Sequence, residues 1–139
     1  MVDETSRYAA KLLFQFRIEF DGESGTMRLC EERILLLHAK RAKQALSLAK
    51  KRGKAAQHRF RNDAGGMVNF EFVGVLDLLR LGSECEEDEV WYDITRRKLP
   101  MERSATILPA ERELNAFREE EMLGLASATA SRGSRSRRR

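Results

Sequence analysis

The chain has 139 residues and a net charge of +4, with 42% hydrophobic and 35% charged residues, which is the balance of one globular domain. It holds no apolar run near the roughly 20 residues of a membrane-spanning helix, and its polar, partly acidic N-terminus is unlike a secretory signal or transit peptide. We therefore expect a cytoplasmic protein that does not enter a membrane, in which Cys30 and Cys85 stay reduced.

An alternation of apolar and polar residues opens the folded part. From Tyr8 to Phe20 every even position is apolar, and most of the odd positions are polar. A period of two predicts a strand with one face on a core. The turn-forming residues 21–25 follow, and the apolar run 29–38 then predicts an antiparallel partner. The chain should therefore begin with a β-hairpin.

A basic segment at residues 39–61 contains nine Lys and Arg residues and no acidic residue. Its first alanine and leucine residues recur at the spacing of an amphipathic helix. We expect this helix to end at Gly53 and a short strand to follow around His58. The nine cations are our candidate binding residues. They are Lys40, Arg41, Lys43, Lys50, Lys51, Arg52, Lys54, Arg59 and Arg61.

Three of these cations, Lys40, Arg41 and Lys43, lie at the start of the helix, where the positive end of the macrodipole favours anions. We therefore expect them to mark the place of an acidic partner. That partner could belong to the same chain or to a second subunit, because residues 63–94 carry a net charge of −8 against +9 on residues 40–62.

The rest of the chain predicts two strands and a second helix. Residues 62–66 form a glycine turn, and a long strand begins at Met67. This strand is apolar on both sides for much of its length, so both sides should be covered. An acidic loop at residues 84–89 leads to a last strand at residues 90–95, and Pro109 begins the second helix.

These elements predict an α+β fold with a mainly antiparallel sheet of about five strands, in the order β-β-α-β-β-β-α. One helix packs on a sheet face, and the second helix is C-terminal. The other face should still expose apolar residues, which the second helix or another subunit would need to cover. The sequence therefore favours neither a homodimer nor a monomer. The residues expected on that face are Leu13, Leu35, Leu37, Val73 and Val75.

The composition changes near the C-terminus. Residues 127–139 contain five arginines and no large apolar residue that could join a core. We expect them to form a disordered Arg-rich tail, and residues 1–126 to form a single α+β domain. Without the tail the net charge would be −1, so the basic character of the whole chain comes from the tail.

Four segments in this order resemble one bacterial family: Y-A-A-K-L-L-F at 8–14, C-E-E-R-I at 30–34, E-F-V-G-V-L-D at 71–77 and V-W-Y at 90–92. The family is known as domain of unknown function 4288. It has no established activity, so the resemblance implies a small bacterial domain and transfers no catalytic residue. Its members tend to have acidic residues at the start of the first helix, so the basic helix start looks like a feature of this chain.

The sequence offers no pattern of catalytic or metal-binding residues. His38 and His58 are the only imidazoles, and neither lies in a pattern with a nucleophile or a metal set. Residues 62–66 lack the following helix, Lys and Ser or Thr of a phosphate loop. We therefore predict no catalytic residue, no metal site, no cofactor and no enzyme activity. His38, at the end of a strand, should be partly buried.

Two kinds of binding function stay open. In the first, the domain is a protein-binding or self-associating module, of the antitoxin or immunity kind among others, which uses a sheet face, an edge strand or the acidic loop. In the second, the basic helix and the Arg-rich tail bind nucleic-acid phosphates. The basic segment offers no aromatic platform except Phe60, and the acidic loop would repel nucleic acid, so we favour the first.

Overall fold

The structure is a computed structural model that describes residues 5–20 and 23–130. Its contacts divide the chain into two compact units, Met1–Asp93 and Ile94–Arg139. The first unit contains an antiparallel sheet with one helix packed on it, and the second contains the C-terminal helix. The predicted α+β fold class is therefore confirmed, and the two units are described separately below.

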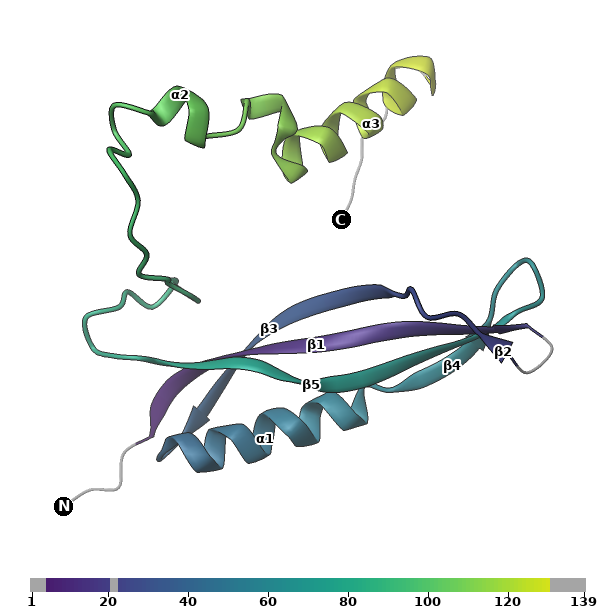
Figure 1. Ribbon diagram of the computed structural model, residues 1–139, viewed down its shortest axis with the longest axis horizontal. Helices are drawn as coiled ribbons and strands as arrows, with labels where there is room; N and C mark the ends of the chain where they lie inside the picture. The colour runs from purple at the N-terminus through teal and green to yellow at the C-terminus, as the bar shows by residue number, and fades with distance from the viewer. Residues whose placement is uncertain (1–4, 21–22, 131–139) are drawn as a thin grey trace. The chain divides into compact units, whose positions relative to one another are not determined.

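Strand β1 (Ser6–Phe20) lies in the middle of the sheet (Figure 1). On one side it pairs with β3 (Leu29–Ala39) and, at its C-terminal end, with the short β2 (Glu23–Ser24). On the other side it pairs with β5 (Met67–Leu81), which in turn pairs with β4 (His58–Arg61). All four pairings are antiparallel, as predicted for the opening hairpin and for the short strand around His58.

Helix α1 (Ala42–Ala55) packs on the sheet face that carries the even positions of β1, which we call the helix face. The opposite surface of the sheet is the reverse face. The main core lies under the helix, where the rings of Phe14 and Phe70 stack with their centroids 4.7 Å apart. The fully or nearly buried residues of this core are Ala10, Leu12, Phe14, Leu37, Ala49 and Phe70. The alternation in β1 thus predicted the buried side of the strand correctly.

Gly53 does not end the helix, contrary to the prediction. Helix α1 continues through it to Ala55, and Gly53 is buried against the sheet. A Cβ atom at Gly53 would lie 2.5 Å from the ring of Phe72, which is far inside van der Waals contact. The absence of a side chain at Gly53 therefore allows the helix to pack close to the sheet. Gly53 is not a left-handed C-cap residue.

The predicted division of apolar residues between the two faces is correct for Leu13, which pairs with Glu32 on the reverse face, but it is wrong for most of the others. The pairing of β1 with β5 has two register shifts, and these leave Val73 and Leu76 out of the ladder. Each bulge reverses the alternation beyond it, so Val75 lies opposite Leu12 on the helix face. Leu35 and Leu37 also belong to the helix face, because they pair with Ala10 and Tyr8 of β1. The reverse face is consequently less apolar than expected.

The last predicted strand, at residues 90–95, does not form. The segment before it is held on the reverse face by Arg7, whose guanidinium donates hydrogen bonds to the carbonyls of Glu86 at 2.8 Å and Glu87 at 2.9 Å. Farther along, the ammonium of Lys11 lies over the ring of Trp91, 4.9 Å from its centroid. These side-chain contacts direct the chain across β1, so it does not pair with the open edge of β5.

The second unit contains a short helix α2 (Ser104–Ile107), a 3-10 turn η1 (Glu111–Glu113) and helix α3 (Asn115–Ala130). The C-terminal helix predicted from Pro109 is confirmed, although the regular helix begins at Asn115. Residues 127–130 of the predicted tail lie in α3, and residues 131–139 lie outside the described residues. In the described part of the chain, no helix has both the length and the apolar character needed to cross a bilayer.

Candidate functional site

Helix α1 covers only one end of the helix face. Its 14 residues span about 21 Å, whereas the 15 residues of β1 span about 50 Å. The helix ends near Phe72, where the Oε1 atom of Gln57 accepts a hydrogen bond of 3.0 Å from the backbone N–H of Phe72. Beyond this point the same sheet face continues, and no helix of the first unit lies over it (Figure 1).

The uncovered end of the helix face carries large apolar side chains that are open to solvent. The exposed fractions are 91% for Met27, 74% for Leu29 and 51% for Phe20. We call this region the distal apolar surface. Its members are Phe16, Ile18, Phe20, Met27, Leu29 and Phe60. Several such residues in one place exceed the scattered apolar exposure that is normal for a protein surface.

The strand register places these residues together. Leu29 of β3 pairs directly with Phe16 of β1, and Phe60 of β4 pairs with Val68, which is itself opposite Ile18. Because directly paired residues point to the same side of a sheet, side chains from three strands share one surface.

Phe20 is positioned by the turn between β4 and β5. A Cβ atom at Gly66 would lie 2.8 Å from the end of the Phe20 ring, so the ring lies directly against the glycine backbone. The turn itself is closed by Asn62, whose Oδ1 atom accepts a hydrogen bond of 2.8 Å from the N–H of Gly66. Gly65 has a φ of 90°, which favours glycine at that position. Residues 62–66 therefore form the turn between β4 and β5 and support the ring of Phe20.

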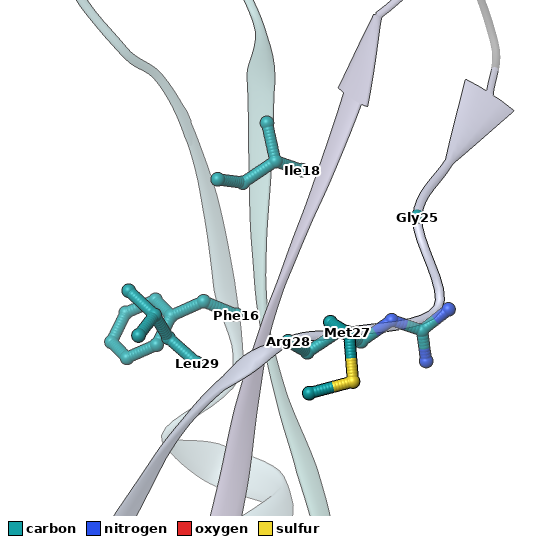
Figure 2. Close-up of a pocket in the computed structure, with 6 residues that line it drawn as sticks. All are labelled: Phe16, Ile18, Gly25, Met27, Arg28 and Leu29. Carbon is teal, nitrogen blue, oxygen red and sulfur yellow. The ribbon is translucent and has the colours of Figure 1, made fainter.

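A pocket of about 150 Å³ opens in the distal apolar surface (Figure 2). Figure 2 shows Phe16, Ile18 and Leu29 pointing to the same side of their strands, while Arg28 points away. The guanidinium of Arg28 donates a hydrogen bond of 3.2 Å to Oε1 of Gln15 on the reverse face. The pocket is therefore lined by apolar side chains, and the charged end of Arg28 lies on the other side of the sheet. Its lining residues are Phe16, Ile18, Gly25, Met27, Arg28 and Leu29.

Arg33 separates the distal apolar surface from the core. Its guanidinium lies 4.9 Å from the centroid of Phe14 and 5.0 Å from that of Phe70, which is the geometry of a cation–π contact. Glu31, two residues earlier on the same side of β3, holds the guanidinium by an ion pair. Of the two adjacent glutamates, Glu31 is thus paired with Arg33, and Glu32 is exposed.

The reverse face below the distal apolar surface is polar. Two nitrogens of Arg17 donate to the carboxylate of Glu71 at 3.0 and 2.7 Å, and Nε2 of Gln15 adds a bond of 2.8 Å. These hydrogen bonds, first from Arg17 and then from Gln15, lower the pKa of Glu71 to about 2. The bonds to Glu71 and then Glu19 raise the pKa of Arg17. Both groups therefore stay charged near neutral pH.

The structure distributes the nine predicted cations over three places, and all nine are exposed. Lys40, Arg41 and Lys43 surround a shallow pocket of about 400 Å³ at the start of α1. Lys50 and Lys54 line a second pocket of about 420 Å³ beside β5. Lys51 and Arg52 lie on the same half of the helix. Arg59 and Arg61 pair with Asn69 and Met67 of β5, which puts them on the reverse face.

No described acidic residue of the first unit forms an ion pair with a cation of α1. Helix α1 contains no Asp or Glu, and no side chain caps its first turn. Apart from Lys40, none of the nine cations forms an ion pair with an acidic residue in the part of the chain that the structure describes. The acidic loop at residues 84–89 is held on the reverse face by Arg7, so it does not neutralise the helix.

The two histidines lie apart. His58 is exposed on β4, where its ring stacks on Phe60 with the centroids 5.7 Å apart. His38 is exposed on β3, and the expectation that it is partly buried is wrong, because it lies on the reverse face of an edge strand. Among residues 5–20 and 23–130, no three His, Cys, Asp or Glu side chains are grouped so that they could hold a metal ion.

Comparison with curated proteins and with solved structures finds no match to this chain. A protein-family model matches residues 7–91, which include all of the sheet except Ser6, helix α1 and the segment held by Arg7. This match covers more than half of the sequence and contains the segments that carry the resemblance, except for Tyr92 at the end of the fourth. The chain therefore belongs to the family described as domain of unknown function (DUF4288).

Proposed function

We propose that this chain is a non-catalytic module that binds another protein through the distal apolar surface. The observation that carries the proposal is the exposure of Phe20 and Leu29 on the same sheet face that α1 covers elsewhere, with Met27 exposed in the loop that precedes β3. Large apolar side chains at one place favour a protein ligand, because burying them removes apolar area from water.

The chemistry of the surface indicates what such a ligand would offer. An apolar side chain would fit the pocket beside Phe16 and Leu29. A protein ligand with an exposed apolar side chain as its anchor is therefore the best match. An antitoxin or immunity protein that holds a toxin in this way is the narrower form of the proposal.

Site-specific photo-crosslinking tests the proposal. Benzoylphenylalanine replaces Met27, which is 91% exposed, and in a control protein it replaces Ser47, which is exposed on α1. Irradiation of cells that express each protein should give an adduct of defined mass from position 27 and none from position 47. The adduct should disappear when Leu29→Glu is added, because a buried carboxylate would lack a partner. Equal adducts from both positions, or no adduct from position 27, would contradict the proposal.

A second candidate is supported by the outer side of α1. Lys43, Lys50 and Lys54 recur at i, i+7 and i+11, so they share one side of a helix that contains no acidic residue. Such a row could follow the phosphates of a nucleic acid. Labelled DNA and RNA are titrated at two salt concentrations with the full chain and with a chain that lacks residues 127–139. The comparison distinguishes binding by α1 from binding by the Arg-rich tail. Binding that persists without the tail and vanishes with Lys43→Glu, Lys50→Glu and Lys54→Glu would support the helix as the site.

A further inference from the structure

Strand β3 forms an open edge of the sheet. It pairs with β1 over its full length on one side, and no described strand pairs with its other side (Figure 1). The backbone N–H and C=O groups that point outward from such a strand are free to pair with another strand. At 11 residues, β3 is long for an unprotected edge, and it contains no proline or described bulge that would block pairing.

The side chains of β3 on the reverse face form a self-complementary series. In order they are Glu32, Ile34, Leu36 and His38, and all four are exposed. Ile34 and Leu36 are each 43% exposed. Glu32 and His38 have no hydrogen bond or ion pair with another described residue. Two apolar residues thus lie between a carboxylate and an imidazole. If a second copy of β3 ran antiparallel beside this one, the carboxylate of each copy would lie opposite the imidazole of the other.

We propose that β3 pairs antiparallel with β3 of a second copy of this chain, about a two-fold axis at Leu35. Ile34 then lies opposite Leu36 of the second copy, and Glu32 lies opposite His38 of the second copy. Each of these contacts occurs twice by symmetry. Cross-strand apolar pairs and carboxylate–imidazole hydrogen bonds are the interactions that stabilise such a ladder. The two sheets would join into one continuous sheet with both α1 helices on the same side.

Three other two-fold registers of the same strands are less favourable. An axis at Glu32 or at Arg33 would place two like charges directly opposite each other, which destabilises a strand pair. An axis at Ile34 would place Glu32 opposite Leu36 and would leave the carboxylate without a partner. The axis at Leu35 alone matches both ends of the series and leaves the existing Glu31–Arg33 ion pair in place.

The neighbouring strand β1 offers no hydrogen-bond partner to the imidazole of His38. Its direct neighbour on β1 is Arg7, and the Arg7 guanidinium is already bonded to the carbonyls of Glu86 and Glu87. The imidazole therefore stays available for the carboxylate of the second copy. This interface lies at the sheet edge and on the reverse face, apart from the distal apolar surface, so either proposal can fail without the other.

Cysteine cross-linking tests the pairing and its register. In full-length protein carrying Cys30→Ser and Cys85→Ser, one sample receives Ile34→Cys and another receives Leu36→Cys. Mild oxidation of the mixture should give a disulfide-linked dimer of twice the 16.0 kDa chain mass, whereas each sample alone should give little. Strong cross-linking of Ile34→Cys alone would overturn the register, and a strict monomer by light scattering would overturn the pairing itself.

Charge variants test the chemistry of the interface. Glu32→Lys should raise the dimer dissociation constant roughly 10-fold, because it changes both symmetry-related contacts. Combining Glu32→Lys with His38→Glu should restore dimerisation, since the swapped charges again face each other. Circular dichroism verifies that each variant is folded, and Glu32→Gln replaces Glu32→Lys if the latter is not. Failure of the double variant to recover, with the fold intact, would contradict the proposed contact.

Discussion

Gly53 occupies the interior of α1, where alanine is ordinarily the better residue by about 1 kcal/mol. The ring of Phe72 reverses this preference, because a Cβ atom at position 53 would lie 2.5 Å from it. We predict that Gly53→Ala lowers the free energy of unfolding by about 1–3 kcal/mol, as overpacking of a core does. Urea unfolding followed by circular dichroism measures the change.

Ser47→Ala is the matched control for Gly53→Ala. Ser47 is exposed on the same helix, so an alanine there should change the free energy of unfolding by a few tenths of a kcal/mol in the stabilising direction. If Gly53→Ala were as stable as Ser47→Ala, the close approach of α1 to Phe72 would not constrain the chain.

Glu71 makes a pH-dependent contribution to stability. Its folded-state pKa, about 2, lies below the ordinary 4.5, so the charged form stabilises the native protein above about pH 4.5. This contribution should be lost as the pH falls from about 4.5 towards 2. We expect the wild-type free energy of unfolding to fall by about 1 kcal/mol more over this range than that of Glu71→Gln, after allowance for solvent screening.

Glu87→Gln is the control for the pH series. The carboxylate of Glu87 contacts no described cation, and its backbone carbonyl, which binds Arg7, is kept in the variant. Its pH profile should therefore follow that of the wild type. Parallel profiles for all three proteins would show that the bonds from Arg17 and Gln15 do not stabilise the fold.

The segment at residues 86–91 is held on the reverse face by side chains of β1. Arg7 binds its carbonyls, and Lys11 lies over Trp91. Trp91 is the single tryptophan of the chain, so its fluorescence reports on this segment alone. We predict that Arg7→Gln shifts the Trp91 emission to longer wavelength and increases its quenching by acrylamide, because the ring becomes more exposed.

Arg80→Gln provides the comparison for this segment. Arg80 donates a hydrogen bond of 3.1 Å to Ser6 and makes no contact with residues 86–91 among those described, so its loss should leave Trp91 emission unchanged. Equal spectra for Arg7→Gln and the wild type would mean that Arg7 does not hold the segment in solution.

Sequence patterns predicted the elements well where one period governs a whole segment. The alternation in β1 and the apolar positions of α1 agree with the structure, because each follows a single local rule. The patterns failed where long-range contacts decide. The bulges at Val73 and Leu76 depend on the partner strand, and the path of residues 86–91 depends on Arg7, which lies far away in the sequence.

The candidate surface was harder to predict than the fold. The nine cations form one block in the sequence, but the helix and β4 carry them to different sides of the sheet. The distal apolar surface was missed because its residues come from three strands and a turn, and each strand looks like ordinary core by itself. The sequence signal that could have indicated this surface is the presence of two large apolar residues, Met27 and Leu29, directly after a turn.

The two units lead to a different division of the chain from the single domain predicted for residues 1–126. The core residues under α1 all precede Asp93, and the sheet, the helix and the segment held by Arg7 all lie within the first unit. The family match ends at residue 91, which is close to the same boundary. The sheet unit should therefore contain the interactions needed for its own stability.

Truncation decides between these two divisions. We predict that a fragment of residues 1–93 unfolds cooperatively in urea with a free energy within about 0.5 kcal/mol of the full chain, because its core is intact. A fragment of residues 1–83 lacks the carbonyls that bind Arg7 and should be less stable by about 1–2 kcal/mol. If residues 1–93 were unfolded while residues 1–126 were folded, the C-terminal segment would belong to the sheet domain, and the single-domain division would be correct.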